Sequence, residues 1–220
     1  MSDLGTASGL ADQLDDGLAA LDQPFDVAKR GALLAYVQLL AKWNGTYNLT
    51  AIREPSRMIT HHLLDSLAVL PVLGRYARAS TTVLDVGSGA GLPGIPIALS
   101  RPDWSVTMLE PVHKKSAFIT QAIGELGLRN ATSHAERVEH FRPVARFSIV
   151  ISRAFSDLAT FAESSAHTLD DDGVLVAMKG VHPHEELREL SDAFAIDAIV
   201  PITVPSIDAA RHVIVVKPKR

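Results

Sequence analysis

The spacing of hydrophobic residues changes near residue 75. Before it, apolar residues recur at the period of an amphipathic helix over 27–43 and again over 56–73. A patch rich in turn formers, residues 44–48, separates these two predicted helices. Beyond residue 75, short β-rich runs alternate with helical ones. The predicted strands cover 82–86, 105–110, 131–133, 147–151 and 173–178, and the predicted helices between them cover 95–100, 114–126 and 158–168.

This alternation indicates a mainly parallel sheet with helices on both faces. A short helix is predicted over 185–194, followed by strands at 198–204 and 212–217. No helix-length segment separates the last two strands, so they should pair as an antiparallel hairpin. We therefore expect an α/β, Rossmann-like fold with a mainly parallel seven-stranded sheet and a C-terminal antiparallel hairpin.

The same pattern divides the chain into three parts. Residues 1–24 are acidic and are expected to be mobile. Residues 25–75 form a helical N-terminal extension, and residues 76–220 form the Rossmann-like domain.

The stretch VLDVGSGAGLPG, residues 83–94, is the strongest candidate for chemistry. It places a glycine-rich loop at the carboxyl end of the first strand, where α/β sheets bind ligands. Glycines there allow the backbone to approach a ligand closely. Glu110 ends the second strand 23 residues after Gly87, a spacing that suits a carboxylate accepting hydrogen bonds from a ribose diol.

Three interpretations of this loop compete: an S-adenosylmethionine site, a dinucleotide site and a turn without a ligand. Asp85 stands two residues before the first glycine, where its charge would repel a pyrophosphate and attract a cationic sulfonium and amino group. Pro93 lies inside the motif and offers no N–H to a phosphate. The residues favour S-adenosylmethionine and leave the other two interpretations open.

The amino-acid composition excludes several kinds of site and suggests where the protein acts. The chain has no cysteine, which excludes disulfides, a thiolate nucleophile and Cys-ligated zinc and is typical of a cytoplasmic protein. No run approaches 18 apolar residues, so we expect no membrane span. His182 and His184 are two candidate ligands without further placed partners, and we expect no metal.

Charge is distributed unevenly along the chain. The net charge is −4, but residues 1–26 hold six acids and no base, and the remainder holds 19 acids and 21 bases. The body is therefore slightly basic, which is compatible with contact to phosphates. The basic residues expected near the ligand edge are Arg137, Arg142, Arg146, Lys114, Lys115 and Lys179.

Seven motifs occur in a characteristic order: KWNGTYNLTAI, HLLDSL, LDVGSGAGLPGIP, KK, RVE, SRAF and MKG. In this order they resemble the bacterial guanine-N7 methyltransferases of small-subunit (16S) ribosomal RNA, the glucose-inhibited division protein B family. The resemblance covers the chain from about residue 27. It implies a class I methyltransferase fold, S-adenosyl-L-methionine as methyl donor, and small-subunit rRNA as substrate.

The resemblance also implies roles for particular residues. Gly87 and Leu92 would line the donor pocket, and Glu110 would hold the donor's ribose. Arg153, which follows a buried strand at the ligand edge, would reach the methionine end or the substrate and is the residue assigned to catalysis. The predicted cofactor-binding set is Asp85, Gly87, Gly89, Gly91, Leu92, Glu110, Val138, Glu139 and Arg153, with Val138 and Glu139 flanking the adenine.

Methylation at guanine N7 sets few chemical demands on the protein. N7 carries a lone pair and no proton, so the enzyme needs to supply position and a suitable field rather than a general base. N7 is poorly accessible in an A-form helix, so the target should be unpaired or flipped out. We expect the protein to be a monomer that acts on a folded ribosomal particle. We also expect Asn48 and the pair His62 and Asp65 to hold the helical extension on the sheet. A small-molecule methyltransferase and an inactive S-adenosylmethionine-binding module remain alternatives.

Overall fold

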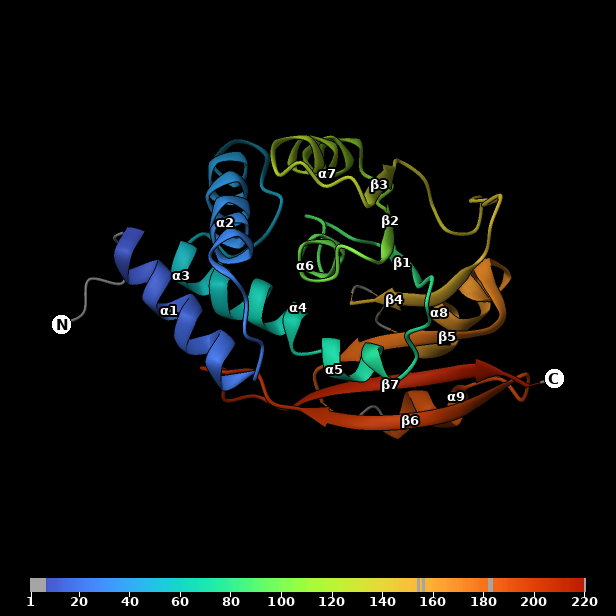
Figure 1. The fold of residues 1–220 in the computed structure, drawn as a ribbon. Helices are drawn as coiled ribbons and strands as arrows, with labels where there is room; N and C mark the ends of the chain where they lie inside the picture. The colour runs from blue at the N-terminus through green and yellow to red at the C-terminus, as the bar shows by residue number, and fades with distance from the viewer. Residues whose placement is uncertain (1–6, 154, 156, 182–183, 220) are drawn as a thin grey trace.

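The computed structural model describes residues 7–153, 155, 157–181 and 184–219. Its centre is a seven-stranded sheet in the order β3-β2-β1-β4-β5-β7-β6 (Figure 1). The strands are β1 (Thr82–Val86), β2 (Ser105–Leu109), β3 (Ala131–His134), β4 (Phe147–Ser152), β5 (Leu169–Lys179), β6 (Phe194–Ile202) and β7 (Arg211–Pro218).

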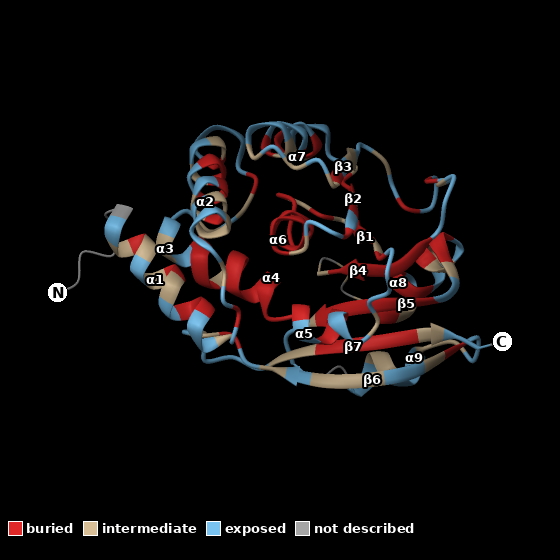
Figure 2. Cartoon of the chain, viewed as in Figure 1, coloured by how far each residue is buried: buried red, intermediate tan, exposed pale blue. Residues whose placement is uncertain are grey.

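The first five strands pair in parallel, and the C-terminal hairpin is antiparallel. β7 inserts between β5 and β6, so the hairpin joins the sheet through its second strand. Figure 2 shows the result: β7 is largely buried, whereas β6 is an edge strand of intermediate exposure. The predicted fold class is confirmed.

Helices cover both faces of the sheet. α6 (Gly94–Ser100) follows β1, α7 (His113–Glu125) follows β2, and α8 (Leu158–Ser165) with a 3₁₀ turn (Ala166–Thr168) follows β4. α9 (His184–Glu189) is shorter than predicted. Side chains alternate along β1, so Val83 packs in the core on the α6 and α7 face and Leu84 in the core on the α8 face. None of the helices in the described part of the chain combines the length and apolar character that crossing a membrane requires.

The N-terminal helices pack on the α6 side of the sheet. They are α1 (Ala7–Ala20), α2 (Val27–Tyr47), α3 (Pro55–Met58), a π-helix (Ile59–Leu64), α4 (Asp65–Leu67) and α5 (Leu70–Gly74). The single helix predicted over 56–73 is therefore a succession of short helices around a π-helical turn.

The turn predicted at 44–48 is wrong, because α2 continues through Tyr47 and ends at Asn48, which adopts the left-handed conformation. The side chain of Asn44 is buried: its Nδ2 donates to Ile52 O at 3.0 Å and its Oδ1 accepts from Thr50 N at 2.9 Å. Asn44, rather than the predicted Asn48, thus holds the following loop against the helix. Asn48 accepts an exposed hydrogen bond from Arg53.

The expectation of a mobile N-terminus needs correction for residues 7–20. They form α1, and Leu10, Leu14 and Leu18 lie at 8%, 0% and 3% exposure in the main core. The acidic residues of this segment lie on the outer face of the helix, and its leucines form an apolar stripe on the inner face. The acidic composition alone did not indicate this stripe. Residues 1–6 lie outside the described residues, and the division of the chain at residues 24 and 75 stays a prediction.

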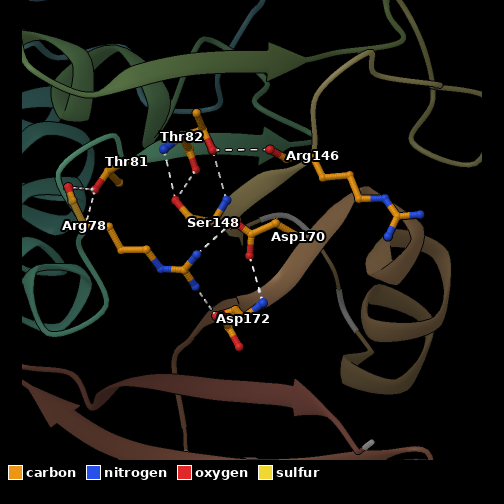
Figure 3. A network of polar contacts seen from close by, with 7 residues as sticks. All are labelled: Arg78, Thr81, Thr82, Arg146, Ser148, Asp170 and Asp172. Carbon is orange, nitrogen blue, oxygen red and sulfur yellow. Dashed lines mark hydrogen bonds and ion pairs between the residues drawn. The ribbon is translucent and has the colours of Figure 1, made fainter.

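A polar network closes the amino ends of the central strands (Figure 3). Ser148 Oγ donates to Thr82 O at 2.9 Å and accepts from Thr82 N at 3.0 Å, which joins β1 to β4. Arg78 contacts Asp170 Oδ2 at 3.0 Å and donates to Asp172 O on β5. These contacts fix the loop before β1 at the end of the sheet opposite the glycine loop.

We expect Leu14→Ala to lower the free energy of unfolding by roughly 2–5 kcal/mol, because it empties a fully buried site. Urea denaturation followed by circular dichroism measures the change. Asp16→Ala, on the exposed face of the same helix, is the matched control and should change stability little. Equal stability of Leu14→Ala and wild type would show that α1 does not dock.

Candidate functional site

The glycine loop between β1 and α6 depends on backbone conformations that favour glycine. Gly87, Gly89 and Gly91 have φ of 72°, 60° and 84°. A Cβ on Gly91 would also lie 2.5 Å from Ile95 Cδ1, and one on Gly94 would lie 2.8 Å from Asp85 Oδ2. The close packing around Gly91 and Gly94 thus adds a steric requirement for glycine.

Three side chains outside the loop fix its backbone. Glu110 Oε2 accepts from Gly89 N at 2.8 Å, and Asp85 Oδ2 accepts from Gly94 N at 2.9 Å. The Tyr36 hydroxyl, on α2, donates to Ala90 O at 2.7 Å, and the Tyr36 side chain is completely buried. The N-terminal helices are therefore part of the support of the loop.

A cavity of about 350 Å³, here called the central cavity, lies on the loop. Gly87, Gly89 and Leu92 line one part of it, and Glu110 and Arg153 line others. Glu110 is 4% exposed, and its Oε1 accepts from Val112 N at 2.9 Å. Each carboxylate oxygen keeps further acceptor capacity, which suits the hydroxyl groups of a ribose.

Two further cavities share walls with the central cavity. The Val138 cavity, about 220 Å³, shares Gly87 and Pro111 with it. The Asp65 cavity, about 420 Å³, shares His62 and Arg153 with it. The three cavities therefore form a series along the carboxyl ends of the strands, with the central cavity in the middle.

Most of the predicted site residues line this series. Gly87, Gly89, Leu92, Glu110 and Arg153 line the central cavity. Val138 and Glu139 line the Val138 cavity. The structure thus brings together seven of the nine residues that the sequence singled out.

Asp85 and Gly91 line none of these three cavities, and their predicted part in donor binding stays a prediction. Asp85 is fully buried beneath the loop, where its Oδ2 accepts from Gly94 N. Gly91 shapes the loop from inside. Both residues therefore shape the loop itself.

The environment of Asp85 opposes its ionisation. Burial raises the pKa of its carboxyl to about 7, although the hydrogen bond from Gly94 N acts in the opposite direction. Its Oδ1 has no hydrogen-bond partner among the described residues. The carboxyl beneath the loop is thus poised to change charge near neutral pH.

Arg153 stands at the wall between the central and Asp65 cavities, and it is held there by Asp65. Its Nη1 lies 3.2 Å from Asp65 Oδ2 and 3.3 Å from His61 O. Arg211, at the start of β7, places its Nε 3.0 Å from Asp65 Oδ1. One buried carboxylate therefore joins the N-terminal helices to β4 and β7.

His62 and Asp65, predicted as a structural pair, do not contact each other by a hydrogen bond. His62 Nε2 lies 2.9 Å from Thr50 Oγ1, and His62 Nδ1 lies 3.0 Å from His61 O. Because a carbonyl only accepts, Nδ1 carries the proton and the Thr50 hydroxyl donates to Nε2. Burial, helped by nearby Arg153, lowers the pKa of His62 to about 4, so it is neutral at pH 7.

The basic residues predicted near the ligand edge differ in their positions relative to the cavities. Lys115 lines the central cavity and Arg137 lines the Val138 cavity. Lys179 lines the Asp65 cavity, is paired with Glu186 at 2.6 Å and donates to Phe155 O, and its expected contact with RNA stays a prediction. His182 lies outside the described residues. Within the described ranges, no cluster of three or more His, Asp or Glu side chains is placed to hold a metal ion.

Sequence reasoning did not assign Thr50, His61 and Arg211 to the site. Thr50 lies in the motif NLT and His61 directly precedes HLLDSL, so both stood beside recognised signals. Arg211 had no such signal, because it reaches the site only through the insertion of β7 beside β5.

Sequence comparison identifies the family. The profile of the rRNA small subunit methyltransferase G family (GidB) matches residues 29–214. The chain belongs to the rRNA small subunit methyltransferase G family. The predicted class of enzyme, an rRNA methyltransferase that uses S-adenosylmethionine, is confirmed by this membership.

Individual members of the family match over nearly their whole length. The chain is 50% identical over 214 residues to ribosomal RNA small subunit methyltransferase G of Nitrosospira multiformis, which covers 94% of this chain and 97% of the relative. The protein of the same name from Laribacter hongkongensis is 46% identical over 205 residues, with 93% and 97% covered.

Solved structures share the fold of this family member at low identity. The glycopeptide N-methyltransferase MtfA aligns with a TM-score of 0.59 and 15% identity, covering 70% of this chain and 96% of MtfA. An S-adenosylmethionine-dependent methyltransferase from Geobacter sulfurreducens, solved with S-adenosyl-L-homocysteine, aligns with a TM-score of 0.54 and 13% identity, covering 83% and 98%.

The raised pKa of Asp85 predicts a pH-dependent stability. Between the ordinary carboxyl pKa of 3.8 and about 7, the folded chain keeps a proton that the unfolded chain releases. The stability contributed by this proton is therefore present below pH 4 and is lost as the pH rises through about 7.

Asp85→Asn removes this titration while keeping an acceptor for Gly94 N. We expect the unfolding free energy of wild type to fall relative to that of Asp85→Asn as the pH rises from 5 to 8, measured by urea denaturation at several pH values. A difference that is independent of pH would contradict the raised pKa.

Proposed function

We propose that the chain transfers a methyl group from S-adenosylmethionine to N7 of a guanine in small-subunit rRNA. The observation that carries this proposal is the series of three adjoining cavities beside the glycine loop of a GidB family member. The cavities share wall residues, so a donor and an acceptor base bound in the series would lie next to each other.

The donor is assigned to the first two cavities. Its adenine enters the Val138 cavity beside Val138 and Glu139, and its ribose hydroxyls bind Glu110. The methionine end lies over Gly87 and Leu92 and reaches Arg153, whose guanidinium suits a carboxylate. Gly89, Gly91 and Asp85 support this arrangement by shaping the loop, as their contacts indicate.

The reaction at N7 needs no base from the protein. His62 is neutral, and its Nε2 accepts from the Thr50 hydroxyl, so it is occupied as a positioning group. The chain's task is to hold the sulfonium methyl in line with the N7 lone pair and to exclude water. Arg153, at the wall between cavities, is the residue assigned to contact both reactants.

We further propose that the chain acts as a monomer in the cytoplasm on a folded small ribosomal particle. N7 of a paired guanine lies in a deep, narrow groove, so a folded particle that displays an unpaired guanine is the better substrate. Arg137 and Lys115, which line two of the cavities, are basic groups suited to RNA phosphates.

Methyl transfer to small ribosomal subunits tests this function. Subunits from cells lacking the enzyme are incubated with the chain and methyl-labelled S-adenosylmethionine, and the RNA is digested to nucleosides. We expect label in N7-methylguanosine, with a higher rate on subunits than on protein-free rRNA. Label in another nucleoside would contradict guanine N7 as the target, and equal rates would contradict the folded particle as the substrate.

Glu110→Gln tests the placement of the donor. Loss of the carboxylate should raise the Kd for S-adenosylmethionine roughly 10- to 100-fold, because hydrogen bonds to a charged group contribute about 1.5–3 kcal/mol. Isothermal titration calorimetry measures this Kd. Glu125→Gln, an exposed change on α7, is the matched control. An unchanged Kd in folded Glu110→Gln would place the ribose elsewhere.

A further inference from the structure

The Asp65 cavity is the part of the site that the donor does not use. It opens beyond Arg153, next to the central cavity, and has a volume of about 420 Å³. We propose that this cavity binds the target guanine after it has left its stack, with O6 recognised by Arg153 and Arg211. The inference rests on the proposed function and adds the base-binding residues to it.

The position of the cavity suits the acceptor. It shares His62 and Arg153 with the central cavity, so a base inside it lies next to the methionine end of the donor. N7 of that base must point to the donor methyl, and O6 is the neighbouring acceptor on the same edge. Arg153, at the wall, is therefore beside O6 when N7 is in line.

The polar groups of the cavity match this edge of guanine. Asp65 uses one oxygen for Arg153 Nη1 and the other for Arg211 Nε. Nη2 of Arg153 and Nη2 of Arg211 have no hydrogen-bond partner among the described residues, and both side chains keep 26% exposure. Arginine donors to O6 and N7 are the commonest specific contacts to guanine.

The apolar wall provides a surface for the ring. Ile52 follows the end of α2, Met178 lies near the end of β5, and Ile202 ends β6. Extruded bases bind between aromatic or apolar side chains, and these three come from separate parts of the chain to one cavity.

Methyl transfer to a base in this cavity balances without a proton acceptor. The S–CH₃ bond breaks with its electron pair staying on sulfur, and the N7 lone pair forms the new N–CH₃ bond. No proton moves, and one positive charge passes from the sulfonium to the base. The Asp65 carboxylate, which is paired with both arginines, offsets one of the two guanidinium charges beside the base.

The local backbone points to the same cavity. His61 and His62 lie in the π-helix Ile59–Leu64, and Asp65 follows directly. All three line the cavity. Single π-helical turns inside helices occur frequently at functional sites.

Nucleotide binding can be observed without methyl transfer. Met178 lines the cavity, whereas Met58 and Met108 are completely buried elsewhere. The full chain is labelled with ¹³C-methyl methionine and saturated with S-adenosylhomocysteine, and Met178→Leu assigns the Met178 resonance. Guanosine 5′-monophosphate at millimolar concentration should shift that resonance, and adenosine 5′-monophosphate should shift it much less.

The kinetics of the Arg211→Gln variant provide a second test of the proposed base-binding cavity. We expect kcat/KM for small subunits to fall roughly 10- to 100-fold because a charged hydrogen bond is lost, while the Kd for S-adenosylmethionine stays unchanged. Lys217→Gln is the matched control, because it removes a basic partner of Asp197 from the exposed end of the same strand.

The outcomes separate the two proposals. A Met178 shift without any transfer to guanine N7 would support the cavity and overturn the function. Transfer to guanine N7 without a Met178 shift, and with unchanged Arg211→Gln kinetics, would overturn the cavity and leave the function standing. A loss of donor binding in folded Arg211→Gln would reassign the cavity to the donor.

Discussion

The site depends on hydrogen bonds that hold a loop with few side chains of its own. Residues 87–94 form that loop, and their shape is maintained from outside by Glu110, Asp85 and Tyr36. Two of these groups come from the ends of neighbouring strands and the third from α2. The loop is therefore supported by both the sheet and the N-terminal helices.

Asp65 likewise connects the N-terminal helices to the sheet through side-chain contacts. It sits at the end of the π-helix and binds arginines on β4 and β7, which lie 88 and 146 residues away in sequence. A buried carboxylate is tolerated when it is paired in this way. Both partners line the Asp65 cavity, and Arg153 also lines the central cavity, so this carboxylate joins the N-terminal helices to the walls of the candidate site.

The sequence predicted those parts of the fold that are governed by local periodicity. β1 was placed residue for residue, and the structure brings Gly87, Glu110 and Val138 to adjoining cavities. α2 extends beyond its predicted end because the buried side-chain amide of Asn44 hydrogen-bonds to the backbone of the following loop. The spacing of hydrophobic residues does not reveal such a contact.

The remaining differences have the same origin. The π-helix leaves no signal in hydrophobic spacing, and Arg211 reaches the site only through sheet order. The motifs predicted that Asp85 lies near a ligand. They did not reveal that the Asp85 side chain lies beneath the loop, where it accepts a hydrogen bond from Gly94 N.

The insertion of β7 has a consequence for how the protein is made. Ribosomes extend the chain from its N-terminus, so the glycine loop, Glu110 and Arg153 all emerge before Arg211. The antiparallel edge of β5 is paired only after β7 has been synthesised, and β6 has no neighbour until then. Arg211 and the rest of β7, which complete the Asp65 cavity, therefore leave the ribosome after the residues that line the central cavity.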